Sequence, residues 1–177
     1  HIFKDADYSL LEEEMEELFE GVYSGAVKVH EIVKALRAFS TSEVEEKQTV
    51  DIEPEVERAV LMISHKLERG VELERKRKTG ARVKAQPGRL SQVFLQLLEN
   101  ALEAIEKKRG KGGRITLAIE KDPDREGYLL VRVGDTGCGM TEEELERAAE
   151  PFYTNKEIGR GTGLGLTTVQ HIVRDLY

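Results

Sequence analysis

Four short segments in the second half of the chain concentrate the side chains that could bind a charged ligand. One offers an amide inside an apolar helix, one a carboxylate beside glycines, one aromatic rings with a lysine, and one a run of glycines. The four segments are residues 96–101, 135–140, 150–156 and 159–166. Amide and carboxylate oxygens suit hard cations and base edges, whereas glycine amides suit anionic oxygens. Together they predict one pocket for a nucleotide and its metal ion.

Asn100 sits within an apolar helical pattern, where a buried amide without partners would cost about 1–3 kcal/mol. Its neutral oxygen suits one position in the coordination shell of Mg²⁺, beside waters and phosphate oxygens. The alternative is a structural asparagine whose amide is satisfied by the protein. The other three segments favour the metal role.

Asp135 follows an alternating apolar segment and precedes Gly137 and Gly139. In this position its carboxylate could accept a hydrogen bond from the exocyclic amine of adenine, while the glycines let the base approach the main chain. Guanine lacks that amine, so this role favours ATP over GTP. The alternative is an ordinary turn aspartate.

Residues 159–165 open a helix that carries no acidic residue before Asp175, and Lys156 and Arg160 stand nearby. Successive glycine amides and the helix N-terminus predict a phosphate site, with a flexible glycine loop that binds nothing as the alternative. Residues 150–156 combine aromatic rings and a cation between flanking glycines. They predict a mobile lid over a triphosphate, which should become ordered on binding.

Two other kinds of nucleotide site do not fit. Glycines 134, 137 and 139 loosely resemble a dinucleotide fingerprint, but three glutamates at 142–144 open the helix that follows. They occupy the positive end of that helix, which a pyrophosphate would need. No Gly-x-x-x-x-Gly-Lys-Ser/Thr loop occurs, so a P-loop enzyme is disfavoured.

The 177 residues are 39% hydrophobic, which allows a buried core, and the formal net charge is −7. A negative chain argues against non-specific binding to nucleic acid, because that binding depends on many cations meeting phosphates. The one cysteine, Cys138, excludes an intrachain disulfide and fits a reducing cytoplasm. No run of roughly 20 apolar residues and no signal peptide occurs. We expect a cytoplasmic fragment without direct membrane contact, from a parent protein that is membrane-anchored or soluble.

The first part of the chain predicts one long helix. Apolar residues follow alternating steps of four and three from Leu11 to Phe39, with Gly25 in the one vacant position, as in a heptad seam. Such a stripe needs a partner helix from the same or another chain. Turn-forming residues at 40–43 then break the period. We expect a coiled-coil-like element at 1–43 and a separate domain at 44–177.

The remainder alternates strands and helices as an α+β sandwich should, with helices on one face of a mixed sheet. Thr141 and Glu144 form a capping box, and the last two strands form a hairpin. We expect strands at 49–52, 71–75, 82–85, 115–119 and 129–133, and helices at 54–68, from 87 to before 110, just after 141, and at 162–176.

With these segments in view, the chain resembles the ATP-binding catalytic domain of a bacterial sensor histidine kinase, preceded by the second helix of its dimerisation hairpin. Asn100 matches the N box of that family, Asp135 the G1 box, Phe152 the F box and Gly161 the G2 box. The resemblance covers the chain from about Val22 onward. It implies the Bergerat-type α/β sandwich that gyrase, heat-shock and mismatch-repair ATPases share.

The resemblance implies ATP and Mg²⁺ as ligands, with Asn100 holding the metal ion. The implied ATP-binding residues are Asn100, Glu103, Ala104, Asp135, Gly137, Gly139, Met140, Phe152, Thr154, Lys156, Arg160, Gly161, Thr162, Gly163, Leu164, Gly165 and Leu166. Asn155 replaces a common threonine, which we expect to be tolerated.

By resemblance, the γ-phosphate passes to a histidine on the first hairpin helix of a homodimer and then to the receiver domain of a response regulator. His30 precedes Glu31 but lies in the second-helix pattern without the usual proline, so we expect the acceptor histidine to lie outside this chain. Gln96 stands where gyrase-type ATPases have a glutamate that activates water, which favours transfer over hydrolysis. The alternatives are a gyrase-like or Hsp90-like ATPase and a nucleotide-binding regulatory module without transfer activity.

Overall fold

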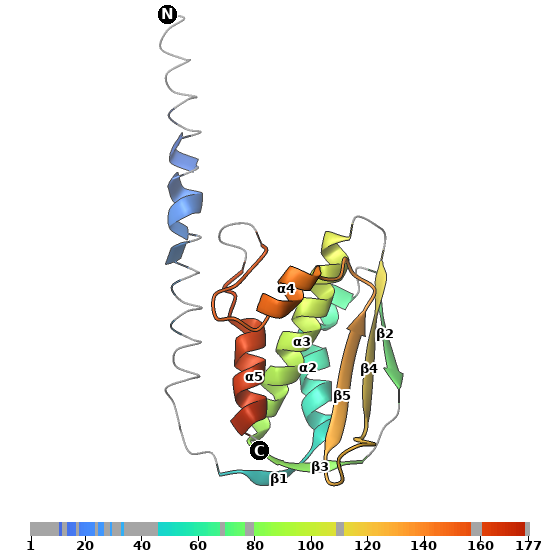
Figure 1. Ribbon diagram of the computed structural model, residues 1–177. Coiled ribbons are helices and arrows are strands. Elements are labelled where there is room, and N and C mark those ends of the chain that lie inside the picture. Colours follow the sequence, from blue (N-terminus) through green and yellow to red (C-terminus); the bar gives the residue numbers. More distant parts are fainter. Residues whose placement is uncertain are drawn as a thin grey trace, which may run out of the picture.

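A computed structural model describes residues 46–67, 70–76, 80–108, 112–156 and 161–175, with helical positions at 11, 14–16, 18–23, 25–26, 29 and 33. From residue 46 onward it contains two small sheets and four helices in the described part of the chain (Figure 1). Their order is β1 (Gln48–Asp51), α2 (Ile52–Leu67), β2 (Val71–Lys76), β3 (Arg82–Ala85), α3 (Pro87–Lys107), β4 (Gly113–Lys121), β5 (Leu129–Asp135), α4 (Glu142–Arg147) and α5 (Gly165–Asp175).

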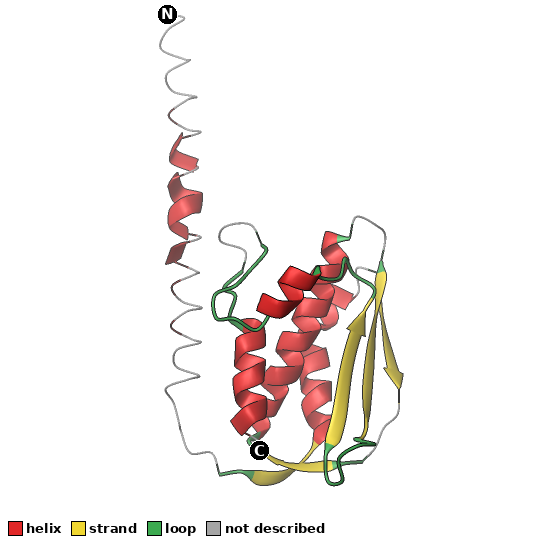
Figure 2. Cartoon of the chain, viewed as in Figure 1, coloured by secondary structure: helices red, strands yellow, loops and turns green. Residues whose placement is uncertain are grey.

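The larger sheet has the order β2-β4-β5 and is mixed, because β2 runs parallel to β4 whereas β4 and β5 form an antiparallel hairpin. Strands β1 and β3 pair antiparallel in a separate two-stranded sheet. Helices α2, α3 and α5 lie on one face of the larger sheet (Figure 2). This is the layered α/β arrangement that the sequence predicts.

Strand β4 shows why the sheet is covered on one face. Ile115, Leu117 and Ile119 are buried and alternate with residues that are more exposed, so every second side chain enters the core. Helices α2 and α3 supply the opposing wall through Ile63, Phe94 and other buried residues. The resulting core fixes α3 against the sheet and leaves its opposite side free to form a site.

Two predicted helix starts are wrong by a few residues. Helix α2 begins at Ile52 rather than at 54, because the Asp51 side chain accepts a hydrogen bond from the Glu53 N–H at 3.2 Å and caps the helix earlier. Helix α5 begins at Gly165 rather than at 162, because Gly163 has a φ of +65° and cannot belong to a right-handed helix.

The structure describes only scattered positions of the predicted N-terminal helix. Those positions are helical, and the side chains of Leu11, Leu18, Val22 and Val29 are exposed. The long helix as a whole and the domain boundary near residue 43 include residues outside the described part, so both stay predictions. No helix of the described residues is long and apolar enough to cross a membrane.

Candidate nucleotide site

Helix α3 has an apolar face and a largely polar face. Its apolar face, which includes Phe94, Leu98 and Ile105, is buried in the core. The other face presents polar side chains at helical spacing, and they line a cavity. These cavity-lining residues of α3 are Gln96, Glu99, Asn100, Glu103, Ala104 and Lys107. Burial of one face therefore aims Asn100 and its polar neighbours into the site.

The loop between β5 and α4 is fixed to the end of α3. The Cys138 N–H donates a hydrogen bond to the Ala104 carbonyl oxygen at 3.0 Å. A Cβ on Gly137 would lie 2.4 Å from the Ala104 carbonyl carbon, so this glycine is needed for the contact between loop and helix. The structure thus gives Gly137 a packing role, and its role of admitting a base to the main chain stays a prediction.

Asp135 is the last residue of β5, and its carboxylate accepts a hydrogen bond from the Gly137 N–H at 2.8 Å. Alternation along β5 places it on the same face of the sheet as Val131 and Val133, which pack against the core. The carboxylate is exposed at the end of that face. This geometry fits both the turn aspartate and the base-binding role.

Helix α4 begins with the predicted capping box. Glu144 N–H donates to Thr141 Oγ1 at 3.2 Å, and Thr141 N–H donates to Glu144 Oε2 at 2.8 Å. The other carboxylate oxygen of Glu144 accepts from Asn155 Nδ2 at 2.8 Å. The hydrogen bond from Asn155, followed by the one from the Thr141 backbone, lowers the pKa of Glu144 below its ordinary value of 4.5.

Residues 150–156, which we call the lid segment, follow α4, and residues 153–156 line the cavity. Arg147 of α4 lies over the Tyr153 ring at 4.3 Å from its centroid, and Lys156 forms an ion pair with Glu103. Phe152 has a φ of 67°, which is uncommon for a residue with a side chain, and its ring is 61% exposed. The lid segment is therefore joined to α4 at one end and to α3 at the other.

The glycine-rich loop contacts the lid segment through backbone atoms. The Phe152 N–H donates to the Gly163 carbonyl oxygen at 2.9 Å, and a Cβ on Gly163 would lie 2.3 Å from the Phe152 carbonyl carbon. Helix α5 starts at Gly165 and has no acidic residue in its first turn. Gly165 and Leu166 line the cavity, so the N-terminus of α5 and the partial positive charge of its N–H groups lie at the cavity wall.

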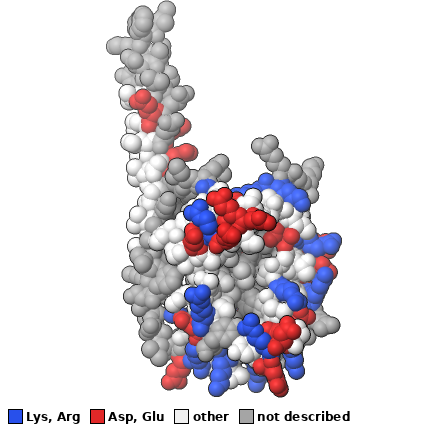
Figure 3. Space-filling model, viewed as in Figure 1, with Lys and Arg blue, Asp and Glu red and all other residues white. Residues whose placement is uncertain are grey.

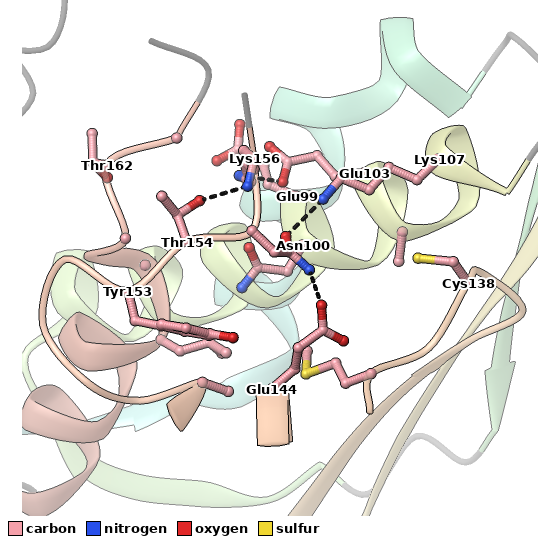
Figure 4. A pocket seen from close by; sticks show the side chains of 18 of the residues that line it. Glu99, Asn100, Glu103, Lys107, Cys138, Glu144, Tyr153, Thr154, Lys156 and Thr162 are labelled. Carbon is pink, nitrogen blue, oxygen red and sulfur yellow. Dashed lines mark hydrogen bonds and ion pairs between the residues drawn. The ribbon is translucent and has the colours of Figure 1, made fainter. Parts of the chain in front are cut away.

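These parts enclose a cavity of about 340 Å³, within the size range of small-molecule sites (Figure 4). Its described wall carries three carboxylates and two ammonium groups. They are Glu99, Glu103, Glu144, Lys107 and Lys156. Figure 3 shows acidic side chains gathered near α4 with basic ones beside them.

Most of the residues assigned from the sequence come together here. The cavity is lined by Asn100, Glu103, Ala104, Gly139, Met140, Thr154, Lys156, Gly161, Thr162, Gly163, Gly165 and Leu166. Four others, Asp135, Gly137, Phe152 and Leu164, are not among its lining residues. Arg160 lies outside the described residues. The binding roles of all these residues remain predictions.

The list assigned from the sequence lacks eight residues of the wall. They are Gln96, Glu99, Lys107, Cys138, Glu144, Ala148, Tyr153 and Asn155. Steps of three and four from Asn100 reach Gln96 and Lys107, so helical periodicity could have found both. Tyr153 and Asn155 lie inside a segment that was predicted as a lid. Glu144 was assigned only to the capping box, and nothing in its spacing signalled a second role.

The comparisons with known proteins agree with this geometry. Residues 85–177 match the family model described as histidine kinase-, DNA gyrase B-, and HSP90-like ATPase. Sporulation kinase E of Bacillus subtilis (strain 168) is 43% identical over 91 residues, which cover 51% of this chain and 11% of that kinase. Sensor histidine kinase ZraS of Klebsiella oxytoca is 45% identical over 92 residues, which cover 52% of this chain and 18% of ZraS.

Among solved structures, the catalytic domain of histidine kinase ThkA aligns with a TM-score of 0.59 and 26% identity over 75% of this chain and 82% of that domain. The matched part is thus less than a fifth of each curated kinase but most of the solved domain. The chain belongs to the family of histidine kinase-, DNA gyrase B- and HSP90-like ATPases, and it contains the Bergerat-type catalytic domain of a sensor histidine kinase.

Proposed function

We propose that the cavity binds ATP and that the domain transfers the γ-phosphate to a histidine. The observation that carries the proposal is the meeting of three elements around one cavity: the polar face of α3, the lid segment and the glycine loop at the start of α5. Phosphates would lie against the backbone amides of Gly161 and Gly163 and the N-terminus of α5. The adenine would lie toward Asp135, whose carboxylate can accept from the exocyclic amine.

Mg²⁺ fits the donor set on α3. Asn100 offers a neutral amide oxygen and Glu103 a carboxylate one turn away, and both line the cavity. Magnesium would neutralise phosphate charge, and it commonly takes one or two protein oxygens together with phosphates and waters. Because the described wall already carries three carboxylates against two ammonium groups, a triphosphate should bind far better with its metal than without it.

Transfer rather than hydrolysis is favoured by the residue at position 96. Gln96 lines the cavity with a neutral amide, which is a poor base at neutral pH. The protein's contribution would then be positioning and charge neutralisation, with the attacking imidazole supplied from outside the domain. We propose a homodimer formed by hairpin helices, with residues 1–43 as part of the second helix and 44–177 as the catalytic domain. Relay to a response-regulator aspartate would follow.

Calorimetric titration of the 177-residue chain with ATP and Mg²⁺ tests the binding step. The chain should bind, whereas Asn100→Asp should lose detectable binding because it places a further negative charge between Glu99 and Glu103. Asp135→Asn should lose it because the adenine amine loses its carboxylate acceptor. Gln170→Ala, which changes an exposed amide on α5, is the matched control and should bind normally. Full affinity in both site variants, with circular dichroism unchanged, would contradict the assigned pocket.

Incubation with radiolabelled ATP and a separately prepared helical hairpin from the parent protein tests the transfer step. Label on a histidine of the hairpin supports the kinase. Steady phosphate release without labelled protein would instead indicate a gyrase-like ATPase, and tight binding with neither reaction would indicate a regulatory nucleotide-binding module.

A further inference from the structure

Asn155 of the lid segment bridges helices α3 and α4. Its Oδ1 accepts a hydrogen bond from Lys107 Nζ at 2.7 Å, and its Nδ2 donates to Glu144 Oε1 at 2.8 Å (Figure 4). Lys107 is the last residue of α3, and Glu144 belongs to the first turn of α4. One amide therefore ties the lid segment to both helices.

The chemistry of the two partners dictates how the amide is oriented. A lysine ammonium can only donate and an ionised carboxylate can only accept, so the oxygen of Asn155 must face Lys107 and its nitrogen must face Glu144. An aspartate could satisfy the lysine but would meet Glu144 with a second carboxylate. An alanine would satisfy neither.

Both attachment points are held independently of Asn155. Lys107 continues a helix whose preceding turn is anchored in the core by Leu102 and Ile105. Glu144 uses its other oxygen, Oε2, to accept from the Thr141 N–H in the capping box. The bridge thus connects the lid segment to fixed supports, and not to another loose segment.

The residues on either side of Asn155 face the glycine loop. A Cβ on Gly161 would lie 2.7 Å from Thr154 Oγ1 and 2.5 Å from Lys156 Cδ, so that loop lies directly against both side chains. Thr154 Oγ1 also accepts from the Lys156 N–H at 3.2 Å. Fixing Asn155 therefore fixes the two residues that stand beside the proposed phosphate loop.

The cavity exists while the bridge is formed, because Lys107, Asn155 and Glu144 all line it. Binding a ligand in the cavity does not require the bridge to break. The ion pair between Lys156 and Glu103 differs, because a phosphate would compete with Glu103 for the ammonium group. The bridge can hold the backbone of the lid segment while the Lys156 side chain changes partner.

We propose that Asn155 is a positioning residue of the nucleotide site, which holds Thr154 and Lys156 against the phosphate loop by bridging Lys107 and Glu144. The proposal rests on the proposed ATP-binding function. It goes beyond the expectation that asparagine at 155 is tolerated in place of a common threonine. Loss of the bridge should let the lid segment move away and shorten the lifetime of the bound nucleotide.

Stopped-flow release of trinitrophenyl-ATP in the presence of Mg²⁺ tests this lifetime. We expect Asn155→Ala and Asn155→Asp to raise the dissociation rate constant about five- to twentyfold, since each removes at least one hydrogen bond to a charged group. The control Gln170→Ala should leave the rate unchanged. Unchanged dissociation in both Asn155 variants, with wild-type binding intact, would overturn the proposal.

Exchanging the amide of Asn155 with the carboxylate of Glu144 distinguishes a positioning role from a simple effect of charge. The double variant Asn155→Asp with Glu144→Gln has the same net charge as the wild type and restores a donor facing an acceptor. Glutamine also keeps the capping box. The double variant should return the dissociation rate to within about threefold of the wild type, which corresponds to about 0.7 kcal/mol at 1.4 kcal/mol per tenfold. A rate that stays as fast as in Asn155→Asp would overturn the proposal.

Hydrogen exchange of the ligand-free protein keeps the test independent of nucleotide binding. Amides of residues 150–156 should exchange faster in Asn155→Ala than in the wild type, whereas amides of β4 should not change. Failure of the wild type to bind the probe would overturn the proposed function, and unchanged exchange in the lid segment would separately overturn the bridge.

Discussion

At the scale of single residues, the site depends on where side chains are missing as well as on where they are present. Gly137 and Gly134 both follow the core residues of β5, but their surroundings differ. A Cβ on Gly137 would meet the backbone of Ala104, whereas a Cβ on Gly134 would meet nothing within 4 Å. Only the first position is closed to alanine by geometry.

We therefore expect Gly137→Ala to push the loop away from α3 and to break the hydrogen bond from the Cys138 N–H to Ala104. The free energy of unfolding should fall by about 1–3 kcal/mol, as for overpacked sites. Gly134→Ala should change it by no more than about 1 kcal/mol, because alanine loses less backbone entropy than glycine. Urea denaturation of both variants measures the difference. Equal stabilities would mean that the loop shifts without cost.

Residue types explain why some site residues could be predicted and others could not. Asn100 and the glycines at 161, 163 and 165 are informative because an amide in an apolar helix needs a hydrogen-bond partner and successive glycine amides can bind an anion. The contacts of Asn155 could not be predicted, because its two partners lie 48 and 11 residues away and meet it only in the folded chain. The need for glycine at 137 could not be predicted either, because it arises from a tertiary contact with Ala104.

At the scale of elements, hydrophobic patterns in the sequence predicted most of the helices and strands. The alternation in β4 and β5 predicted the hairpin correctly, and the capping box predicted the start of α4. Helix ends were less accurate, since Asp51 and Gly163 act through cap geometry and a positive φ that hydrophobic periodicity does not record. The sequence pattern also did not specify the parallel pairing of β2 with β4, because the paired residues lie some forty positions apart in the chain.

Helix α4 should depend on pH through Glu144. Its folded-state pKa lies below the ordinary value of 4.5, so the ionised form is the one that the capping box and Asn155 stabilise. The stabilisation is fully present above 4.5 and is lost as the pH falls through the folded-state pKa. The Thr141 amide resonance should therefore shift in an NMR titration with a midpoint below 4.5, and α4 should fray below it.

Glu144→Gln is the control for this titration. Glutamine accepts the same hydrogen bond from Thr141 but does not ionise, so the Thr141 amide should lose its pH-dependent shift while α4 stays capped. A midpoint above 4.5 in the wild type, or the same transition in the glutamine variant, would contradict the assignment.

At the scale of the whole molecule, the two parts of the chain present different surfaces. From residue 46 onward the described chain has a continuous core, whereas the described helical positions before it expose apolar side chains. Leu18 is 67% exposed and Val22 is 64% exposed, and both lie on the predicted heptad seam. Exposed apolar stripes of this kind mark contact surfaces, so a second helix should cover the seam.

Sedimentation equilibrium tests whether that helix comes from a second copy. The 177-residue chain should associate reversibly, and Leu18→Glu with Val22→Glu should make it monomeric, because charges in the seam would have to be desolvated. Tyr23→Glu is the matched control, since Tyr23 is 75% exposed but lies off the seam, and it should leave association intact. Nucleotide affinity should be the same in all three proteins, because every described residue that lines the cavity lies between 96 and 166. Equal loss of association in the Tyr23→Glu control would show that the contact does not use the seam. A monomeric wild type would show that the covering helix comes from elsewhere in the parent protein.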